Sequence, residues 1–300
     1  MKKPETKSRS CWWRTLCLLI LGSSLALSQD RVRILLSNDD GFQHPGLKAL
    51  VVKLAPLGEI VVAAPSVNQS GVGHAMTFKE PIAVESWMDG SVRWYAVSAM
   101  PGTCVRLALK SLVEKAPDFV ISGINRGENV GIMTLSSGTV ACAREAALQG
   151  VPAISVNLQH GKTMDYEGAA DFVVTVVKDL RQKRLPPGTY LNVNYPALPR
   201  DQVKGVLLTR LDGRAPSEKY EKIVSPQGKI SYRSIWTPLK DGNRDTDTWA
   251  LTQGFISVTP LQIDQTQPAE LEKLRSWPSL KTFPPPTKKL SGQDINRSRS

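Results

Sequence analysis

Two adjacent carboxylates, Asp39 and Asp40, end a run of aliphatic residues in the segment RILLSNDDG, residues 33–41. Like charges at this spacing repel, and each raises the pKa of the other. A bound cation would relieve the repulsion, so the pair is a candidate metal site. Taken alone, however, Asp-Asp-Gly after a strand is more often a turn with a helix cap.

Three later clusters carry polar side chains of related types. Ser70 lies in APSVNQSG (64–71), Asn125 and Asn129 lie in SGINRGENVG (122–131), and Ser137, Gly138 and Thr139 lie in LSSGTV (135–140). Each has a structural alternative, because Ser-Gly-Thr is a common helix cap and Gly-x-Asn-x-Gly suits a tight turn. Their shared placement after predicted strands or at the start of a predicted helix favours a composite site.

The chemistry of these clusters is that of oxygen donors and an anion cradle. Carboxylate, hydroxyl and amide oxygens suit hard divalent cations, with Mg²⁺ or Mn²⁺ favoured and Ca²⁺ behind. Residues 137–139 open a helix whose free N–H groups favour a phosphate. His44, His74 and His160 are too scattered for a zinc site and are assigned to surface or packing roles. A metal beside an anion cradle indicates phosphoryl chemistry.

The elements that must position these residues alternate between strand and helix. Apolar runs predict strands over 32–38, 60–65, 118–125, 153–158 and 190–196, and helical spacing predicts helices over 44–58, 101–117, 138–150 and 171–182. Trp87 and Trp94 fall in a predicted hairpin. Near-continuous apolar strands alternating with helices indicate an α/β fold with a mostly parallel sheet covered on both faces. Ligands bind beyond the carboxyl ends of such strands, which is where Asp39 and Asp40 lie.

The last third of the chain has a different pattern. Segments 203–214, 230–238 and 254–263 read as strands without a strong helix between them, which predicts a C-terminal antiparallel hairpin extension over about 203–266. Residues 281–300 are polar, led by prolines and basic, and they predict a disordered tail. The folded domain is expected to span 29–280.

Residues 1–28 are typical of a secretory signal peptide. Five basic residues precede the short apolar run CLLILGSSLAL, and Ala26 and Ser28 fit a small-x-small cleavage pattern with Gln29 as the first mature residue. The apolar run is shorter than the roughly 20 residues that span a bilayer. We therefore expect an exported protein, periplasmic or secreted, without stable membrane insertion after cleavage. An uncleaved anchor is the alternative, and a non-functional leader would leave the protein cytoplasmic.

The net charge of +11 invites a nucleic-acid interpretation, but the charge lies on the two ends. Residues 1–28 and residues 281–300 each carry five basic residues and one acidic residue, which leaves +3 for the body. A nucleic-acid-binding domain should carry its basic surface on the folded body, so no duplex partner is expected. Of the four cysteines, Cys104 and Cys142 remain after cleavage, and we interpret them as two separate buried thiols rather than a disulfide.

With these residues assembled, the sequence resembles the SurE family of metal-dependent survival-protein phosphatases and nucleotidases. The matching stretches include RILLSNDDGFQHPGLKAL, VVAAPSVNQSG, SGINRGENVG, SSGTVACAREAALQGVPAISVNL and, late in the chain, TDTWALTQGFISVTPLQIDQT, so the resemblance covers about residues 33–266. It implies a Rossmann-like core, one divalent metal per subunit, and hydrolysis of nucleoside 5′- or 3′-monophosphates and other phosphomonoesters. It also implies a homodimer or homotetramer, formed partly through the C-terminal extension.

The resemblance assigns roles to residues of this chain. The metal ligands are Asp39, Asp40, Ser70 and Asn125, and the phosphate contacts are Asn129, Ser137, Gly138 and Thr139. We expect Asp39 to act as general base, with a covalent nucleophile as the alternative, and Asn125 to stabilise charge on the transferring group.

The chain departs from the family pattern around the site rather than at the metal positions. Ser66-Val67 replaces an Asp-Arg pair, Gly102-Thr103 replaces Ala-Asp, and residues 132–136 lack the usual acidic residues and tyrosine. These changes leave open an exported binding protein without catalysis, since fold alone does not give function. A dinucleotide-dependent oxidoreductase is weaker, because no G-x-G-x-x-G follows the first strand.

Overall fold

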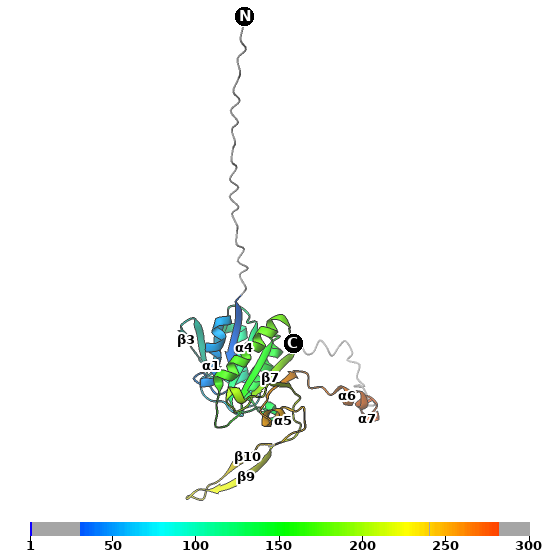
Figure 1. Cartoon of the computed structure of the whole chain (residues 1–300). Coiled ribbons are helices and arrows are strands. Elements are labelled where there is room, and N and C mark those ends of the chain that lie inside the picture. Colours follow the sequence, from blue (N-terminus) through cyan, green and yellow to red (C-terminus); the bar gives the residue numbers. More distant parts are fainter. Residues whose placement is uncertain (2–30, 240, 282–300) are drawn as a thin grey trace, which may run out of the picture. The chain divides into compact units, whose positions relative to one another are not determined.

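A computed structural model describes Met1 and residues 31–239 and 241–281 (Figure 1). The chain divides after Arg31, and the account below concerns Val32 onward. The predicted signal peptide and the predicted tail over 282–300 lie outside the described residues, and Lys281 ends a short helix. None of the helices in the described ranges has the length and apolar character needed to cross a bilayer.

A nine-stranded sheet forms the centre of the domain, in the order β3-β4-β2-β1-β5-β6-β7-β11-β8. The bounds are β1 Val32–Ser37, β2 Gly58–Pro65, β3 Val84–Asp89, β4 Val92–Val97, β5 Phe119–Arg126, β6 Ala153–Leu158, β7 Thr189–Tyr195, β8 Val206–Leu208 and β11 Ile256–Gln262. The six strands from β4 to β7 in this order run parallel, and β3 and β11 pair antiparallel to them. The predicted mostly parallel α/β sheet is confirmed.

Helices cover both faces of the sheet, as predicted. They are α1 Pro45–Leu54 with η1 Ala55–Leu57, α2 Pro101–Leu107 with the π-helical turn η2 Ala108–Leu112, α3 Gly138–Leu148 and α4 Tyr166–Gln182, with η3 Gly131–Leu135 before α3 and η4 Arg200–Gln202 after β7. Because successive residues of a strand point to opposite faces, Ile34 and Leu36 pack with α1 and α4, whereas Leu35 packs with α2 and α3. Both faces of β1 are therefore buried, which explains its unbroken apolar run.

Two predicted helices differ at their ends. The helix predicted over 101–117 stops at Leu112, because Val113 turns to extended backbone and Pro117 disfavours a helical residue before it. The helix predicted over 171–182 begins five residues earlier, since Asp165 caps it by accepting a hydrogen bond from the Gly168 N–H.

The C-terminal third is only partly the predicted extension. Strands β8 and β11 join the main sheet, and only β9 (Ser217–Val224) and β10 (Ile230–Thr237) form a separate antiparallel hairpin (Figure 1). One short helix that was not predicted, α5 (Asp247–Thr252), lies between the second and third predicted strands, and α6 (Pro268–Leu274) and α7 (Pro278–Lys281) follow the last one. These helices have four to seven residues, too few for a clear helical period to show in the sequence.

The cysteine and tryptophan expectations are confirmed. Cys104 and Cys142 are buried free thiols, and burial raises the pKa of Cys142 to about 12. Trp87 and Trp94 lie opposite each other on β3 and β4 with their rings stacked, 6.0 Å between centroids. Both indoles therefore serve packing at this edge of the sheet.

Candidate active site

The end of β1 is shaped by a tight turn that presents the two aspartates. Asn38 closes it, because its side-chain amide donates to the Gly41 carbonyl at 2.9 Å and its oxygen accepts from the Gly41 N–H at 3.2 Å. Gly41 takes a φ of 98°, which favours glycine. Asn38 and Gly41 thus build the turn, and the two carboxylates are left for other contacts.

Asp39 is a buried carboxylate held by the start of α3. Its side chain is almost fully enclosed, and its Oδ1 accepts a hydrogen bond from the Thr139 hydroxyl. Burial raises the pKa of Asp39 to about 6, the nearby Asp40 charge adds to the rise, and the Thr139 hydrogen bond opposes it. In the described part of the chain, Asp39 forms no ion pair with Lys or Arg. The site thus buries a negative charge that lacks a protein cation.

The N-terminus of α3 reaches Asp39 because residue 138 has no side chain. A Cβ placed on Gly138 would lie 2.7 Å from the Asp39 Cβ and 3.0 Å from Cγ of Pro101. Ser137 caps the helix, and its hydroxyl accepts from the Val140 N–H at 3.1 Å. Three of the predicted phosphate contacts, residues 137–139, therefore stand at a helix N-terminus beside Asp39.

Asp40 points to the neighbouring strand β5. Its Oδ2 accepts from the Arg126 backbone N–H at 3.2 Å and lies 3.7 Å from Nδ1 of His44. Burial raises the pKa of Asp40, and the Arg126 hydrogen bond opposes the rise. His44 is the N-cap of α1 and its ring meets Tyr166 edge-on. The assignment of His44 to a surface or packing role did not include its N-cap role, although its place before Pro45 marks a helix start.

Asn125 completes the contact between β5 and α3. Its amide nitrogen donates to the Gly127 carbonyl at 2.9 Å, which leaves its oxygen turned toward Thr139, 3.4 Å from the hydroxyl. Asp39, Asn125 and Thr139 are therefore gathered at one point, from three segments that are far apart in the sequence. The role of Asn125 as a metal ligand stays a prediction.

The loop that carries Ser70 is tied to the backbone of the first aspartate. The Gln69 N–H donates to the Asp39 carbonyl at 2.7 Å, and the Ser70 N–H donates to Oδ1 of Asn68 at 2.8 Å. Ser70 is exposed. The structure brings its loop to Asp39, and the role of Ser70 as a metal ligand stays a prediction.

Asn129 lies in a cluster of buried asparagines, and in the described part of the chain no hydrogen bond joins it to either aspartate. Its side-chain amide donates to Asn157 at 2.7 Å, its backbone N–H donates to Asn194 at 2.8 Å, and its carbonyl accepts from Asn192 and Asn194. This cluster locks the loop after β5 onto β6 and β7. The nitrogen of Asn129 is thus already used, and its role as a phosphate contact stays a prediction.

His74 anchors the Ser70 loop to α3, which its assignment to surface or packing roles did not foresee. Its Nε2 lies 3.2 Å from Oε2 of the fully buried Glu145, and the Gly73 N–H donates to the Ser136 carbonyl at 2.9 Å. A carboxylate only accepts, so Nε2 carries the proton. No sequence signal pairs His74 with a glutamate 71 residues away.

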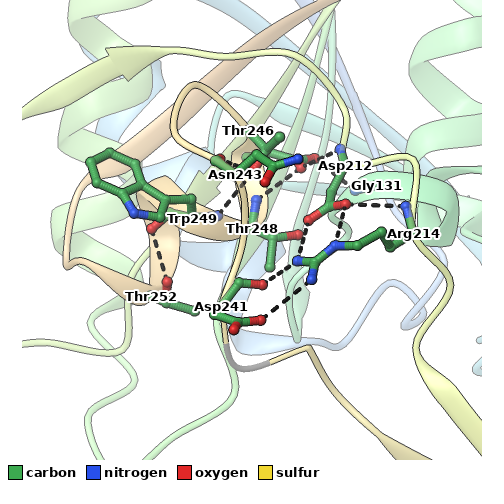
Figure 2. A network of polar contacts seen from close by, with 10 residues as sticks. Gly131, Asp212, Arg214, Asp241, Asn243, Thr246, Thr248, Trp249 and Thr252 are labelled. Atoms are coloured by element: carbon green, nitrogen blue, oxygen red, sulfur yellow. Dashed lines mark hydrogen bonds and ion pairs between the residues drawn. The ribbon is translucent and has the colours of Figure 1, made fainter.

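A polar network fixes the loop after β5 from its other side (Figure 2). Asp247, fully buried at the first turn of α5, accepts from the Gly131 N–H at 2.7 Å and from the Asp212 N–H at 2.9 Å. Gly131 has a φ of 52°, and a Cβ there would lie 2.4 Å from the Asp212 carbonyl oxygen. The late sequence match around Thr246–Asp247 therefore supports the site loop structurally.

The donors available for a metal are two carboxylates, one amide and one hydroxyl. Among the described residues, no group of three or more His, Cys, Asp or Glu side chains is placed to hold a metal ion. The set fits a hard cation with oxygen ligands and does not fit zinc. The buried charge of Asp39 beside the half-buried Asp40 is the feature that such a cation would neutralise.

Comparisons with known proteins identify the family. A family model described as "Survival protein SurE" matches residues 34–218. A 5′-nucleotidase SurE of Methylobacillus flagellatus is 42% identical over 253 residues, 83% of this chain and all of that protein. A 5′-nucleotidase SurE 1 of Thermus thermophilus is 39% identical over 247 residues, 81% of this chain and 96% of that protein.

A solved structure agrees with these sequence matches. The crystal structure of the SurE protein from Aquifex aeolicus superposes with a TM-score of 0.72 at 37% identity, and it covers 81% of this chain and 98% of that one. The family-model match over residues 34–218 contains Asp39, Asn125 and Thr139. This chain belongs to the SurE family.

Proposed function

We propose that this protein is a divalent-metal-dependent phosphomonoesterase that hydrolyses nucleoside monophosphates. One observation carries the proposal: Asp39 is a buried carboxylate without a Lys or Arg ion pair among the described residues, and it contacts the N-terminus of α3. A cation on one side and an anion cradle on the other side are what phosphoryl transfer to water needs.

The residues around Asp39 fit a divalent ion. Asp39, Asp40, Ser70 and Asn125 offer only oxygen donors, which Mg²⁺ and Mn²⁺ accept and which Ca²⁺ also accepts. A bound divalent ion would polarise a phosphoryl oxygen and favour ionisation of a nearby water. Oδ2 of Asp40 accepts a hydrogen bond from the Arg126 N–H, which orients the carboxylate before any ligand arrives.

The protein groups have separate tasks in this proposal. Asp39 removes the proton of the attacking water, or attacks phosphorus itself. The amides of residues 138 and 139, at the start of α3, donate to the phosphoryl oxygens where negative charge accumulates. The Thr139 hydroxyl holds Asp39 in place.

The relatives' names support a nucleotide substrate, because the matched proteins are named 5′-nucleotidases. The test is release of inorganic phosphate from adenosine 5′-monophosphate, p-nitrophenyl phosphate and glycerol 2-phosphate, each with Mg²⁺, Mn²⁺ or EDTA. We expect release that EDTA abolishes. A protein that binds nucleotide but releases no phosphate with any metal would be the non-catalytic binding protein instead.

The β9–β10 hairpin supports a homo-oligomer. Opposed residues of an antiparallel pair share a face, and the pairs Val224–Ile230 and Lys222–Tyr232 place Tyr220, Val224, Ile230, Tyr232 and Trp236 on one face. All five are exposed and share this face with Lys222 and Glu218, whereas the opposite face carries Lys219, Glu221 and Arg233 beside Ile223 and Ile235. An isolated two-stranded hairpin is marginally stable in water, so we propose that the apolar face packs on a second copy.

Light scattering tests this assembly. Coupled to size-exclusion chromatography, it should show wild type as a dimer or tetramer and the Val224→Glu variant as a monomer. The Lys219→Glu variant, changed on the opposite face of the hairpin, should behave as wild type. A wild-type monomer, or assembly that is unchanged in the Val224 variant, would overturn the proposal.

A further inference from the structure

We propose that a cavity beside the active site binds a flat aromatic ring in the leaving group of the substrate, such as a nucleobase. The cavity has a volume of about 150 Å³ and is called the side pocket here. Its wall is made by the loop after β5, the end of β10 with the residues that follow, and α5. The proposal rests on the phosphatase function above and adds the site that selects its substrate.

The side pocket borders the segment that carries the predicted phosphate-binding residues. Glu128 in its wall is three residues from Asn125, which is at most about 10 Å of extended chain. Met133 in its wall is four residues before Ser137, about 8 Å along the 3₁₀ turn η3. A phosphate at the start of α3 would therefore leave the other end of a nucleotide within reach of the pocket.

The lining suits a planar ring. Val130, Met133, Leu239 and Leu251 supply apolar walls, and Trp236 supplies an aromatic face that is about half exposed. Aromatic rings favour stacked or edge contacts with other planar rings, and small-molecule sites combine such walls with few polar groups. The polar side chains of the lining are Gln159, Thr248 and Thr252, with the charged Glu128 and Arg214.

A network of hydrogen bonds and ion pairs joins residues of the wall (Figure 2). Arg214 is held by the Asp212 carboxylate at 2.9 Å and by Asp241, and Asp247 joins Gly131 to the same network. The Thr248 hydroxyl lies close enough to the Asp212 carboxylate to lower the pKa of that group. Yet this buried hydroxyl makes no hydrogen bond of ordinary geometry with another described residue.

The experiment compares two substrates in two variants. Trp236→Ala removes the aromatic face, and Thr252→Trp, at the exposed end of α5, fills the pocket. We expect kcat/KM for adenosine 5′-monophosphate to fall about tenfold in each variant, mainly through KM. Hydrolysis of glycerol 2-phosphate, which has no ring, should stay within twofold of wild type.

Tyr232→Ala is the matched control, because Tyr232 is an exposed aromatic residue on the same face of the same hairpin and does not line the pocket. If Tyr232→Ala lowers kcat/KM for the nucleotide as much as Trp236→Ala, the effect comes from oligomer assembly and the proposal fails. Equal losses for both substrates in the Trp236 variant would also overturn it.

Binding of adenosine without metal separates this proposal from the proposed function. We expect saturation-transfer NMR to show adenosine contacts with wild type that are lost in Thr252→Trp, with ribose as the negative control. Phosphate release without adenosine binding would reject the side pocket and keep the phosphatase. Adenosine binding without phosphate release from any substrate would reject the phosphatase and keep the pocket.

Discussion

At the residue scale, the central fact is a buried carboxylate that the protein alone does not neutralise. Asp39 is enclosed by α3 and accepts only the Thr139 hydroxyl among the described side chains, so burial lifts its pKa to about 6. Such a group costs stability when it is ionised, and a protein tolerates that cost where the charge has a function. In the proposed metal site, the Asp40 carboxylate and the Asn125 side-chain oxygen would bind the same cation as Asp39.

Replacing Asp39 with Asn should separate catalysis from stability. We expect kcat to fall by roughly 10²–10⁴-fold, because the group that removes the proton is lost while Thr139 can still donate to the amide oxygen. The assay is phosphate release, with circular dichroism to confirm the fold. Near-normal turnover would contradict the role of Asp39.

The same variant makes a stability prediction in metal-free protein. An acid whose folded pKa is raised from 3.8 to about 6 destabilises the fold increasingly as pH rises between these values, and fully above 6. Metal-free Asp39→Asn should therefore be more stable than wild type at pH 7, by on the order of 3 kcal/mol, and equal to it near pH 4. Urea unfolding in EDTA at both pH values measures this difference, and equal stability at pH 7 would refute it.

At the element scale, the site depends on how closely α3 approaches β1. Gly138 permits that approach, and the cap on Ser137 aims the helix N-terminus at Asp39. A second link, from His74 to Glu145, holds the Ser70 loop against the same helix. Helix α3 is therefore the common support of the anion cradle and the Ser70 loop.

Gly138→Ala should push the helix away from Asp39. The added methyl would overlap the Asp39 side chain, so we expect a loss of about 1–3 kcal/mol in unfolding free energy and a fall in kcat of at least tenfold. Gly213→Ala is the control, because a Cβ there meets nothing within 4 Å. Thermal melts and phosphate release measure both, and an unaffected Gly138 variant would show that the approach is not tight.

Glu145 links α2, α3 and the Ser70 loop, and we expect its contribution to the free energy of unfolding to depend on pH. Burial alone raises the pKa of Glu145, but hydrogen bonds from His74, Arg106 and Gln149 outweigh it and bring the value to about 2. A depressed carboxylate stabilises the fold above its unfolded pKa near 4.5, and that stability is lost as pH falls toward 2.

We therefore expect Glu145 to lower the unfolding free energy of wild type by on the order of 3 kcal/mol as the pH falls from its unfolded pKa toward its folded pKa. Glu145→Gln should lack this component, whereas Glu85→Gln, on the exposed strand β3, should follow wild type. Urea titrations at several pH values between 2 and 6 provide the measurement, and parallel curves for Glu145→Gln and wild type would count against the link.

At the scale of the whole molecule, the proposals of export and of assembly rest on the two ends of the chain and on the β9–β10 hairpin. The basic excess lies on residues 1–28 and 281–300, which fits an exported chain better than a nucleic-acid-binding one. The hairpin presents an apolar face that a second copy can cover. We propose that the protein is exported and assembles after cleavage.

Export is tested by the mass of the protein recovered from the periplasm or medium of an expressing bacterium. We expect the mature chain to begin at Gln29, because Ala26 and Ser28 fit the cleavage pattern. Leu19→Arg, which interrupts the apolar run, should leave the protein in the cytoplasm. A membrane-bound product that retains residues 1–28 would favour the uncleaved anchor.

The sequence by itself determined the alternating strands and helices, the rim on which the polar clusters lie, and the family. Apolar runs and caps are local, so the mostly parallel character of the sheet and the place of Asp39 and Asp40 after β1 could be predicted from short stretches of chain. The short helix α5 and the entry of β8 and β11 into the main sheet did not follow, because these elements are stabilised by partners distant in sequence.

Only the tertiary structure decided which polar residues share a point in space. It joined Thr139 to Asp39 across 100 residues and His74 to Glu145 across 71, and it turned the Asn129 side chain into an asparagine cluster. Such pairings depend on packing between elements, which residue type and spacing along the chain do not reveal. The spacing of Asp39 and Asp40 therefore predicted a cation site, whereas the groups that surround the two aspartates are determined by the fold.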